Sequence, residues 1–349
     1  MPYSKTCPYC GEPLRLNEAE KTAHCDACEA ELPPEELLVQ REEAVLGLLQ
    51  ERPQKQADRD GFLCENCGAQ VIADEGDVSS FCCFCGAPAM APMMLPDTID
   101  PEAVLPFAID RVQAQDRFAH WFSRKKLIDP GFLHAVRSGR VSGIYVPFWL
   151  FDCEIETHLH AVSTATSTLR TDRSEVMTAK DYFHYRAVTA DYRSVPVLAS
   201  EKVNGHLADL LGPFDLTMLV PFDPALMAGF VAERNSLTAQ QAFRQVREQL
   251  EADSLRAARE SILTDAYAQV KTVRHLYKTL RAQYVLMPVW TVNYSRNGFT
   301  HQFFMNGQTG KIVGEVPLSL SRTLQWFAGV AAGVAAAGEL VWVAVNKLR

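Results

Sequence analysis

Basic side chains are scarce where this chain is richest in cysteine. Residues 1–33 hold three basic side chains against six acidic ones, and residues 58–92 hold only Arg59 against six acidic ones. The whole chain of 349 residues carries a formal net charge of −8. Affinity for a phosphate backbone comes from Lys and Arg side chains that displace counterions. This charge balance therefore argues against a nucleic-acid-binding role for the cysteine-rich segments.

Signals of catalysis are scarce as well. No nucleophile with an adjacent base and no cofactor-binding loop stands out along the chain. Asn306-Gly-Gln-Thr-Gly310 has the glycines of a phosphate loop but lacks the Lys-Ser/Thr pair and the helix that follow one, so we interpret it as a turn. His158 and His160 share one face of a predicted strand, and the pattern favours solvent-facing side chains over a metal site. The sequence thus predicts a protein that is not an enzyme.

Cysteine is confined almost entirely to two segments. Outside residues 7–28 and 64–85 there is only Cys153, which we expect to be a buried, apolar side chain. Each segment carries two Cys-x2-Cys pairs separated by 14 residues. One such pair is a weak signal, but two pairs at this spacing, repeated identically, are typical of zinc ribbons. The predicted metal ligands are Cys7, Cys10, Cys25 and Cys28 in the first segment, and Cys64, Cys67, Cys82 and Cys85 in the second.

Disulfide bonds and an iron site are the two alternatives to zinc for these cysteines. Four thiolates fill a tetrahedral Zn²⁺ site with no vacant position, which is typical of a structural site. Disulfides need an oxidising compartment, whereas residues 1–6 are polar and we expect no signal peptide. A rubredoxin-like iron site is the other alternative. We predict two Zn²⁺ per chain, with Cys83 either a bystander or a replacement for its neighbour Cys82.

The residues after the predicted ligands support knuckle turns. Glycine can take the positive φ that such a turn needs, and it follows three of the eight ligands, as Gly11, Gly68 and Gly86. Glu29 takes the corresponding place after Cys28, so the last knuckle of the first segment is the least regular.

The fold class that we predict is α+β, with two N-terminal four-cysteine zinc ribbons, an antiparallel-sheet domain with a helical insertion, and a C-terminal transmembrane helix. The domain boundaries are a first ribbon over 1–33, a helix and linker over 34–60, a second ribbon over 61–92, the α+β domain over 100–320 with its insertion over about 200–267, and the membrane helix over 323–345.

Two helices of the α+β domain have clear starts. Residues 110–126 carry Phe118, Trp121 and Phe122 at helical spacing, with Asp110 as the N-cap, and we expect these aromatic side chains to face the core. Thr238 and Gln241 form a capping box before a helix that reaches about residue 263. Residues 270–284 fit either a helix with one basic face or a strand.

Strands are predicted in two groups. Residues 143–152 are apolar and indicate a buried strand, and residues 153–170 alternate like a second, half-exposed strand. Residues 284–294, 299–305 and 311–316 indicate an antiparallel meander whose turns lie at 296–298 and 306–310. Pro147 and Pro288 begin similar Pro-x-Trp motifs, and we expect both at a strand start or a sheet edge because proline lacks a ladder donor.

The chain has one long apolar run. Residues 324–345 form a stretch of 22 residues that would span about 33 Å as a helix, enough for a bilayer. Trp326 and Trp342 lie near its ends, as in interfacial belts. Glu339 is costly in this setting, and a buried soluble helix or a partner-binding helix is the alternative. We expect a single span in the cytoplasmic membrane, with the bulk of the chain in the reducing cytoplasm.

Several motifs together resemble a known family, the bacterial zinc-ribbon membrane proteins of the transcription-factor-IIB ribbon type, which are sometimes labelled primosomal helicase relatives. The resemblance covers nearly the whole chain. It rests on the two four-cysteine segments and on Val104-Leu-Pro-Phe107, Gly143-Ile-Tyr-Val-Pro-Phe-Trp-Leu-Phe-Asp152, Leu286-Met-Pro-Val-Trp290 and Phe304-Met-Asn-Gly-Gln-Thr-Gly-Lys311.

The resemblance implies a function without an established catalytic activity. Some similar proteins are encoded beside phage-shock protein A and a flotillin-like SPFH protein, which implies a recruiter for membrane-stress machinery. We therefore expect a membrane-anchored zinc-ribbon adaptor that binds protein partners at the cytoplasmic membrane face. The alternative is a zinc-ribbon nucleic-acid-binding protein associated with replication or transcription, which salt-sensitive binding to DNA or RNA would reveal.

Overall fold

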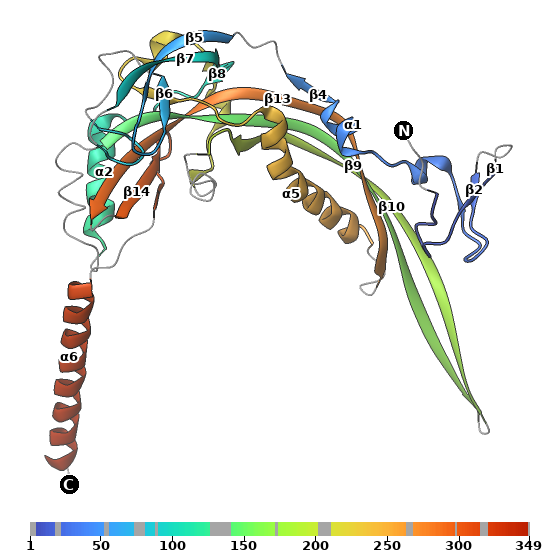
Figure 1. Cartoon of the computed structure of the whole chain (residues 1–349). Coiled ribbons are helices and arrows are strands. Elements are labelled where there is room, and N and C mark those ends of the chain that lie inside the picture. Colours follow the sequence, from blue (N-terminus) through green and yellow to red (C-terminus); the bar gives the residue numbers. More distant parts are fainter. Residues whose placement is uncertain are drawn as a thin grey trace. The chain divides into compact units, whose positions relative to one another are not determined.

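The fold is a mixed α+β arrangement, seen in a computed structural model (Figure 1). The structure describes residues 5–17, 22–51, 56–72, 81–87, 90–125, 141–171, 174–201, 211–262, 268–296, 299–314 and 320–347. The chain divides into two compact units. Unit 1 comprises Met1–Pro53, Trp149–Ala199 and Leu237–Tyr284, and unit 2 comprises Gln54–Phe148, Ser200–Ser236 and Val285–Arg349.

Unit 1 begins with the first cysteine segment. Strands β1 (Arg15–Asn17), β2 (Thr22–His24) and β3 (Glu31–Leu32) form a small antiparallel sheet. A 3-10 turn, η1 (Pro34–Leu37), the five-residue helix α1 (Glu42–Leu46) and strand β4 (Leu49–Glu51) follow. The helix predicted over the segment after the ribbon is therefore only one short turn of α-helix, because its apolar positions are too loosely spaced to define a face.

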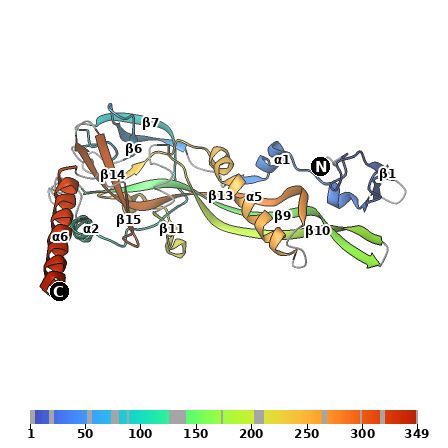
Figure 2. The same cartoon turned by 90° about the horizontal axis from the view of Figure 1, so that it is seen from below.

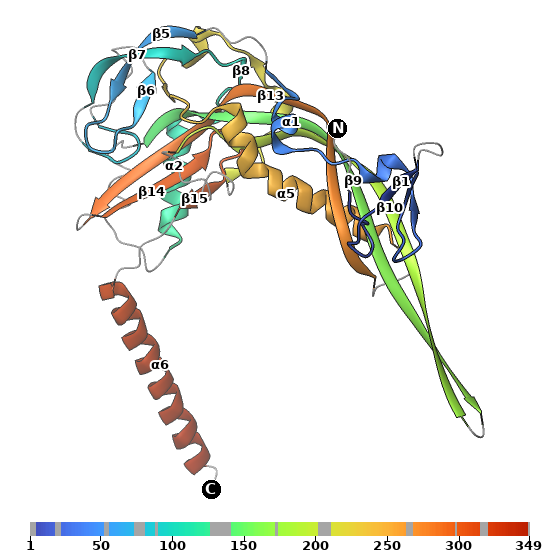
Figure 3. The ribbon, with the colours of Figure 1, turned by 45° about the vertical axis from the view of Figure 1, so that its right-hand side comes forward.

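Two long strands form the centre of unit 1. Strand β9 (Val141–Thr171) pairs with β10 (Ser174–Leu198), and the two strands run side by side (Figures 1 and 3). The separate strands predicted over 143–152 and 153–170 are one continuous strand. Strand β13 (Gln269–Arg296) contains the segment 270–284, so the strand alternative is the right one there. Its residues Leu280–Ala282 pair in parallel with β4.

Helix α5 (Ala239–Glu260) lies along one face of these strands (Figure 2). The predicted capping box is confirmed, since Gln241 N–H donates to Thr238 Oγ1 at 3.3 Å and Thr238 N–H donates to Gln241 Oε1 at 2.8 Å. The helix buries a stripe that includes Phe243, Val246 and Leu250. Of the predicted helical insertion over about 200–267, residues 202–210 and 263–267 lie outside the described residues. Residues 212–238, which contain Pro213, Pro221 and Pro224, form 3-10 turns and short strands instead of α-helix.

Unit 2 contains the second cysteine segment and the meander. Strands β5 (Gln56–Leu63), β6 (Gln70–Ile72) and β7 (Ala91–Ile99) pair antiparallel, and β6 also pairs with β12 (Val231–Glu233), which runs parallel to the start of β9. Strand β8 (Ala103–Val104) pairs with β11 (Val220–Pro221) and with β13. Two 3-10 turns, η2 (Leu216–Met218) and η3 (Pro224–Met227), flank β11.

The predicted meander is confirmed. Strand β13 pairs antiparallel with β14 (Phe299–Asn306), which pairs antiparallel with β15 (Ile312–Gly314). Asn297 and Gly298 of the first predicted turn lie outside the described residues. Helix α2 (Arg111–Ser123) packs beside the meander (Figure 3), and its N-cap is Asp110, as predicted, with Phe118 and Phe122 buried in the core.

The family-like motifs meet in one part of unit 2. Gly307 N–H donates to the carbonyl of Pro288 at 2.9 Å, and the Gly307 carbonyl accepts from the N–H groups of Ala108 and Ile109. The Trp290 indole donates to the Ile109 carbonyl at 2.9 Å. These bonds join the segments before α2, inside β13 and after β14, so the motifs serve to hold the fold together.

Phe107 lies at the centre of this junction. Its ring stacks on Phe230 at 4.3 Å and contacts Tyr145 and Trp290 at about 5 Å. Pro147 and Pro288 both lie inside strands, so of the two placements predicted for them the strand start is wrong and the sheet edge is the one left open. The structure shows how Pro288 is accommodated inside β13. Strand β8 pairs with β13 as far as Leu286, and β14 pairs with it from Val289 onward. Pro288 lies between these two paired stretches, where neither β8 nor β14 requires a donor from it.

We expect Gly307→Ala to destabilise unit 2. A Cβ at this position would lie 2.7 Å from Phe107 Cδ1 and 2.8 Å from Pro288 Cβ, and neither rigid ring can move aside. The cost should be about 1–3 kcal/mol, measured as a lower urea midpoint of the full chain in a nonionic detergent. Gly329→Ala is the control, since a Cβ there meets nothing within 4 Å. Equal midpoints for the two variants would show that the junction is loosely packed.

Candidate metal centres

The first cysteine group lies in unit 1. Cys7 and Cys10 come from the turn before β1, and Cys25 and Cys28 come from the turn after β2. Their four Sγ atoms all lie within 4.8 Å of one another, with 3.6 Å between Cys7 and Cys28 and 3.4 Å between Cys10 and Cys25. The predicted ligand set is therefore assembled at one point.

The second group, in unit 2, has the same geometry. Cys64 and Cys67 follow β5, and Cys82 and Cys85 come from the turn that precedes β7. The Sγ atoms again lie within 4.8 Å of one another, with 3.6 Å between Cys64 and Cys85 and 3.8 Å between Cys67 and Cys82.

All four knuckles are closed by the same backbone bond. In each, the N–H of the residue after the second cysteine donates to the carbonyl of the first, at 2.8–3.0 Å. The donors are Gly11, Gly68 and Gly86 at φ of 85°, 69° and 73°, and Glu29 at 59°. The predicted need for positive φ is confirmed, and Glu29 bears the steric cost that a non-glycine residue meets in this conformation.

Both groups fit a metal ion. Zinc–thiolate bonds of about 2.3 Å in a tetrahedron imply about 3.8 Å between sulfur atoms. The observed separations of 3.4–3.8 Å are close to that value and far from a disulfide bond of about 2.05 Å. None of the ten cysteines forms a disulfide bond, so the disulfide alternative does not hold in this structure. Each four-cysteine group can hold one metal ion with no vacant position.

Nearby N–H groups favour the thiolate form at two of these positions. Burial raises the pKa of Cys25, but hydrogen bonds from the backbone N–H groups of Cys28 and Ala27 and from the thiols of Cys10 and Cys28 together bring it to about 7. Burial likewise raises the pKa of Cys85, while Asn66 Nδ2, 3.4 Å from its Sγ, and other donors bring it to about 7. The thiolate is the form that binds metal, and these donors stabilise it at Cys25 and Cys85.

Cys83 is not part of the second group, although its backbone anchors that group to the sheet. Its carbonyl accepts a hydrogen bond from Asn293 Nδ2 and a bond of 3.5 Å from Thr291 Oγ1. The Gln302 amide donates to the carbonyl of Phe84. The bystander alternative for the Cys83 side chain is therefore the one that the geometry supports.

The second ribbon is thus continuous with the sheet of unit 2. Its strand β6 pairs with β12, and its last knuckle is bonded to β13 and β14. Sequence patterns could not show this, because β12 lies far along the chain from the ribbon and is only three residues long.

The first ribbon contacts the β9–β10 hairpin through the aromatic residue of its first knuckle. The Tyr9 ring lies 5.0 Å from the His160 ring and 4.9 Å from Phe183. His160 is fully buried and His158 is 5 % exposed, so the expectation of solvent-facing histidines is wrong. Burial, followed by the nearby Arg274 guanidinium, lowers the pKa of His160 to about 4, which keeps the imidazole neutral near pH 7. The physical reason for the error is that a strand pattern does not reveal which distant segment covers it.

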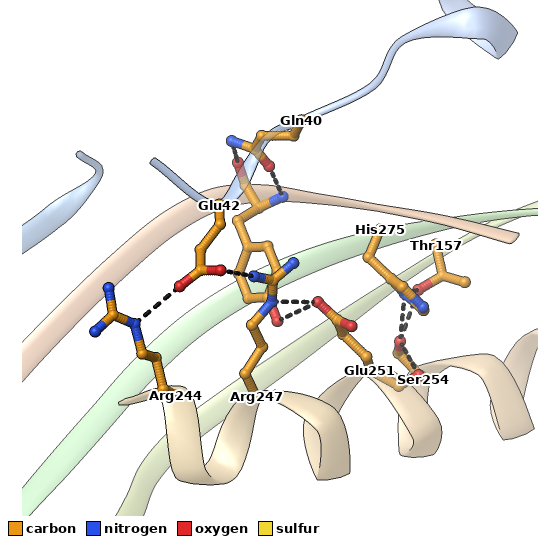
Figure 4. A network of polar contacts seen from close by, with 9 residues as sticks. Gln40, Glu42, Thr157, Arg244, Arg247, Glu251, Ser254 and His275 are labelled. Carbon is orange, nitrogen blue, oxygen red and sulfur yellow. Dashed lines mark hydrogen bonds and ion pairs between the residues drawn. The ribbon is translucent and has the colours of Figure 1, made fainter. Parts of the chain in front are cut away.

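A polar network beneath α5 was not predicted (Figure 4). Glu251 Oε1 accepts from Arg247 Nε at 2.7 Å and from the Tyr277 hydroxyl at 3.2 Å. Thr157 Oγ1 lies 2.6 Å from Ser254 Oγ and 2.9 Å from His275 Nδ1.

The same network reaches the segment after the first ribbon. Gln40 exchanges two hydrogen bonds with the Tyr277 backbone, and Glu42 pairs with Arg244 at 2.8 Å. Ser254 and Thr157 are fully buried, so their hydroxyl groups are closed to a substrate and instead join α5 to the strands.

The apolar run forms helix α6 (Leu320–Lys347). Its segment Thr323–Val343 is 21 residues long and apolar enough to cross a membrane, and none of the side chains described in it is buried within the structure. The alternative of a helix buried in a soluble core is therefore not supported.

We expect Cys82→Ser and Cys83→Ser to differ sharply. Removing the Cys82 thiolate leaves three ligands, so the variant should lose about one metal ion per chain, measured by elemental analysis of the purified protein. Cys83→Ser keeps the backbone carbonyl that anchors the turn and should retain the full metal content. Metal loss in Cys83→Ser with retention in Cys82→Ser would instead make Cys83 the ligand.

Comparison with known proteins places the chain among relatives. No family model matches it, and no solved structure gives a significant match. A Bacillus subtilis strain 168 protein described as uncharacterized, YdjG, is 34 % identical over 244 residues, which cover 69 % of this chain and 71 % of that protein. Identity of this extent shows common ancestry, and the chain belongs to the same family as Bacillus subtilis YdjG.

Proposed function

We propose that this protein is a non-enzymatic, membrane-anchored zinc-ribbon adaptor that recruits protein partners at the cytoplasmic face of the membrane. The observation that carries the proposal is the combination of two closed four-thiol groups with an exposed apolar helix of membrane-spanning length. The first gives rigid surfaces without a reactive metal position, and the second gives an anchor.

The metal chemistry supports zinc in a structural role. Sulfur separations near those of a zinc tetrahedron and four-thiolate ligand sets favour Zn²⁺, and a site filled by four protein ligands has no position for a substrate or a reactive water. The transcription-factor-IIB type of ribbon is a finer assignment, and the spacing of two residues within each pair is consistent with it.

The charges favour protein partners over nucleic acid. Each four-thiolate zinc site adds a formal charge of −2 to segments in which acidic side chains already outnumber basic ones. Such surfaces repel phosphate groups and attract basic protein segments. Phage-shock-type and flotillin-like proteins are the partner classes that the family resemblance suggests, which would place the adaptor in a membrane-stress response.

The membrane anchor can be tested by one substitution and its matched control. We expect Val334→Arg to weaken membrane retention, because a charged residue near the centre of a span costs about 2.5–3.5 kcal/mol in insertion. Val112→Arg is the same change at a side chain of similar exposure, 66 % against 68 %, on helix α2. Resistance to alkaline carbonate extraction should fall in the first variant and stay unchanged in the second. Full extraction of the unaltered chain would make α6 a docking helix.

The adaptor role predicts partners that depend on the metal groups. The full chain, purified from detergent-solubilised membranes of its own host, should retain proteins that a Cys7→Ser/Cys10→Ser variant loses while remaining membrane-bound. Cys83→Ser is the matched control, because it removes a thiol that lies outside both metal groups. An unchanged partner set in the double variant, or tight binding to DNA with a steep dependence on salt, would contradict the proposal.

A further inference from the structure

Unit 2 contains a cavity of about 250 Å³ that the metal groups do not use. Strands β5 and β7 form one side of it, and the segment around η3 forms another. Its floor is apolar and consists of Ile72, Phe222, Met227, Phe230 and Leu286. These side chains belong to one hydrophobic cluster, so the floor is the exposed part of a packed core.

The mouth of the cavity is acidic. Asp58, Asp60 and Asp100 line it together with Arg59, the single basic side chain among the described lining residues. Arg59 Nη2 lies 2.6 Å from Asp100 Oδ1, so these two charges neutralise each other. Asp58 and Asp60 are exposed and have no basic partner within the part of the chain that the structure describes. A formal charge of −2 is therefore left beside an apolar floor.

The strand pair is irregular at this mouth. Consecutive side chains of a regular strand point to opposite faces, yet Asp58, Arg59 and Asp60 all line the same cavity. The register between β5 and β7 shifts between Ala57 and Arg59. Opposite the shift, Asp97 takes a φ of 48° and its N–H donates to Asp58 Oδ1 at 3.4 Å. Irregularities of this kind break the strict alternation of a strand, so three consecutive residues can line one cavity.

We propose that this cavity docks a protein segment in which a leucine or phenylalanine is flanked by lysine or arginine. The apolar floor takes the hydrophobic side chain, and Asp58 and Asp60 pair with the flanking cations. Complementary charge selects a basic partner and rejects an acidic one. The inference rests on the proposed adaptor function, because it names the chemistry of one partner segment.

Three labelled tetrapeptides test both parts of the recognition. The first probe is acetyl-Lys-Leu-Phe-Lys-amide. The second has glutamate in place of both lysines, and the third has serine in place of the two apolar residues. Each peptide is titrated by fluorescence polarisation against the full chain in a nonionic detergent. The first should bind about tenfold more tightly than either of the others, and its affinity should fall as salt screens the carboxylates. Equal binding of the three peptides, or no saturable binding of the first, would overturn the proposal.

Variants locate the binding in the cavity. Met227→Lys places a cation on the floor and should abolish binding, whereas Met94→Lys makes the same change on β7 outside the cavity, at a side chain that is 56 % exposed, and should leave it unchanged. Asp58→Asn/Asp60→Asn alters only exposed groups and should weaken binding of the first peptide several-fold without changing the urea midpoint. Equal binding by Met227→Lys and Met94→Lys would place the peptide elsewhere.

Failure here is distinct from failure of the adaptor role. If the peptide does not bind while the full chain still retains metal-dependent partners, the cavity assignment is wrong and the adaptor stands. If the peptide binds as expected but no partner is retained, the cavity is a recognition site and the adaptor role of the ribbons is wrong.

Discussion

Four sulfur atoms held within 4.8 Å of one another set the main constraint on both ribbons. Four thiolates at this separation repel one another strongly, and a bound cation removes that repulsion. Each knuckle bond joins two backbone groups, so it orients the two cysteines of its pair without using their thiols. The two groups share this geometry but differ in what else supports them. The first lies in a small apolar cluster with Leu32, Leu37 and Ala23, whereas the second is bonded to β13 and β14 of the large sheet. The first ribbon should therefore depend more heavily on its metal.

Local chemistry was predictable from the sequence. Cysteine spacing identified both ligand sets, and the capping residues Asp110 and Thr238 identified the starts of α2 and α5. Turn residues and alternating patterns identified the meander of β13, β14 and β15. In each case the signal lies within a few residues of the structure it specifies, so the physical cause is visible in a short window of sequence.

The parts that were missed depend on segments far apart in the chain. His158 and His160 are buried where Tyr185 of the neighbouring strand β10 packs against both rings and Tyr9 of the first ribbon packs against His160, and the pattern of β9 alone does not contain that information. Residues 270–284 are a strand because β4 and β9 pair with β13, which overrides a pattern that also fits a basic helix. The cavity of unit 2 was invisible for the same reason, since β5, β7 and η3 form it together.

Negative charge recurs at the surfaces to which we assign binding. It outnumbers positive charge in both cysteine segments and at the mouth of the cavity. With α6 in the bilayer, as proposed, the cytoplasmic leaflet would present anionic headgroups to the rest of the chain. Like charges repel over about one Debye length, roughly 8 Å at physiological ionic strength, so the acidic surfaces gain nothing by lying on the membrane. In this proposal α6 holds the chain at the membrane. The negative surface charge keeps the ribbons and the cavity away from the lipid. Together they leave those surfaces available to basic protein segments, which experience the opposite force.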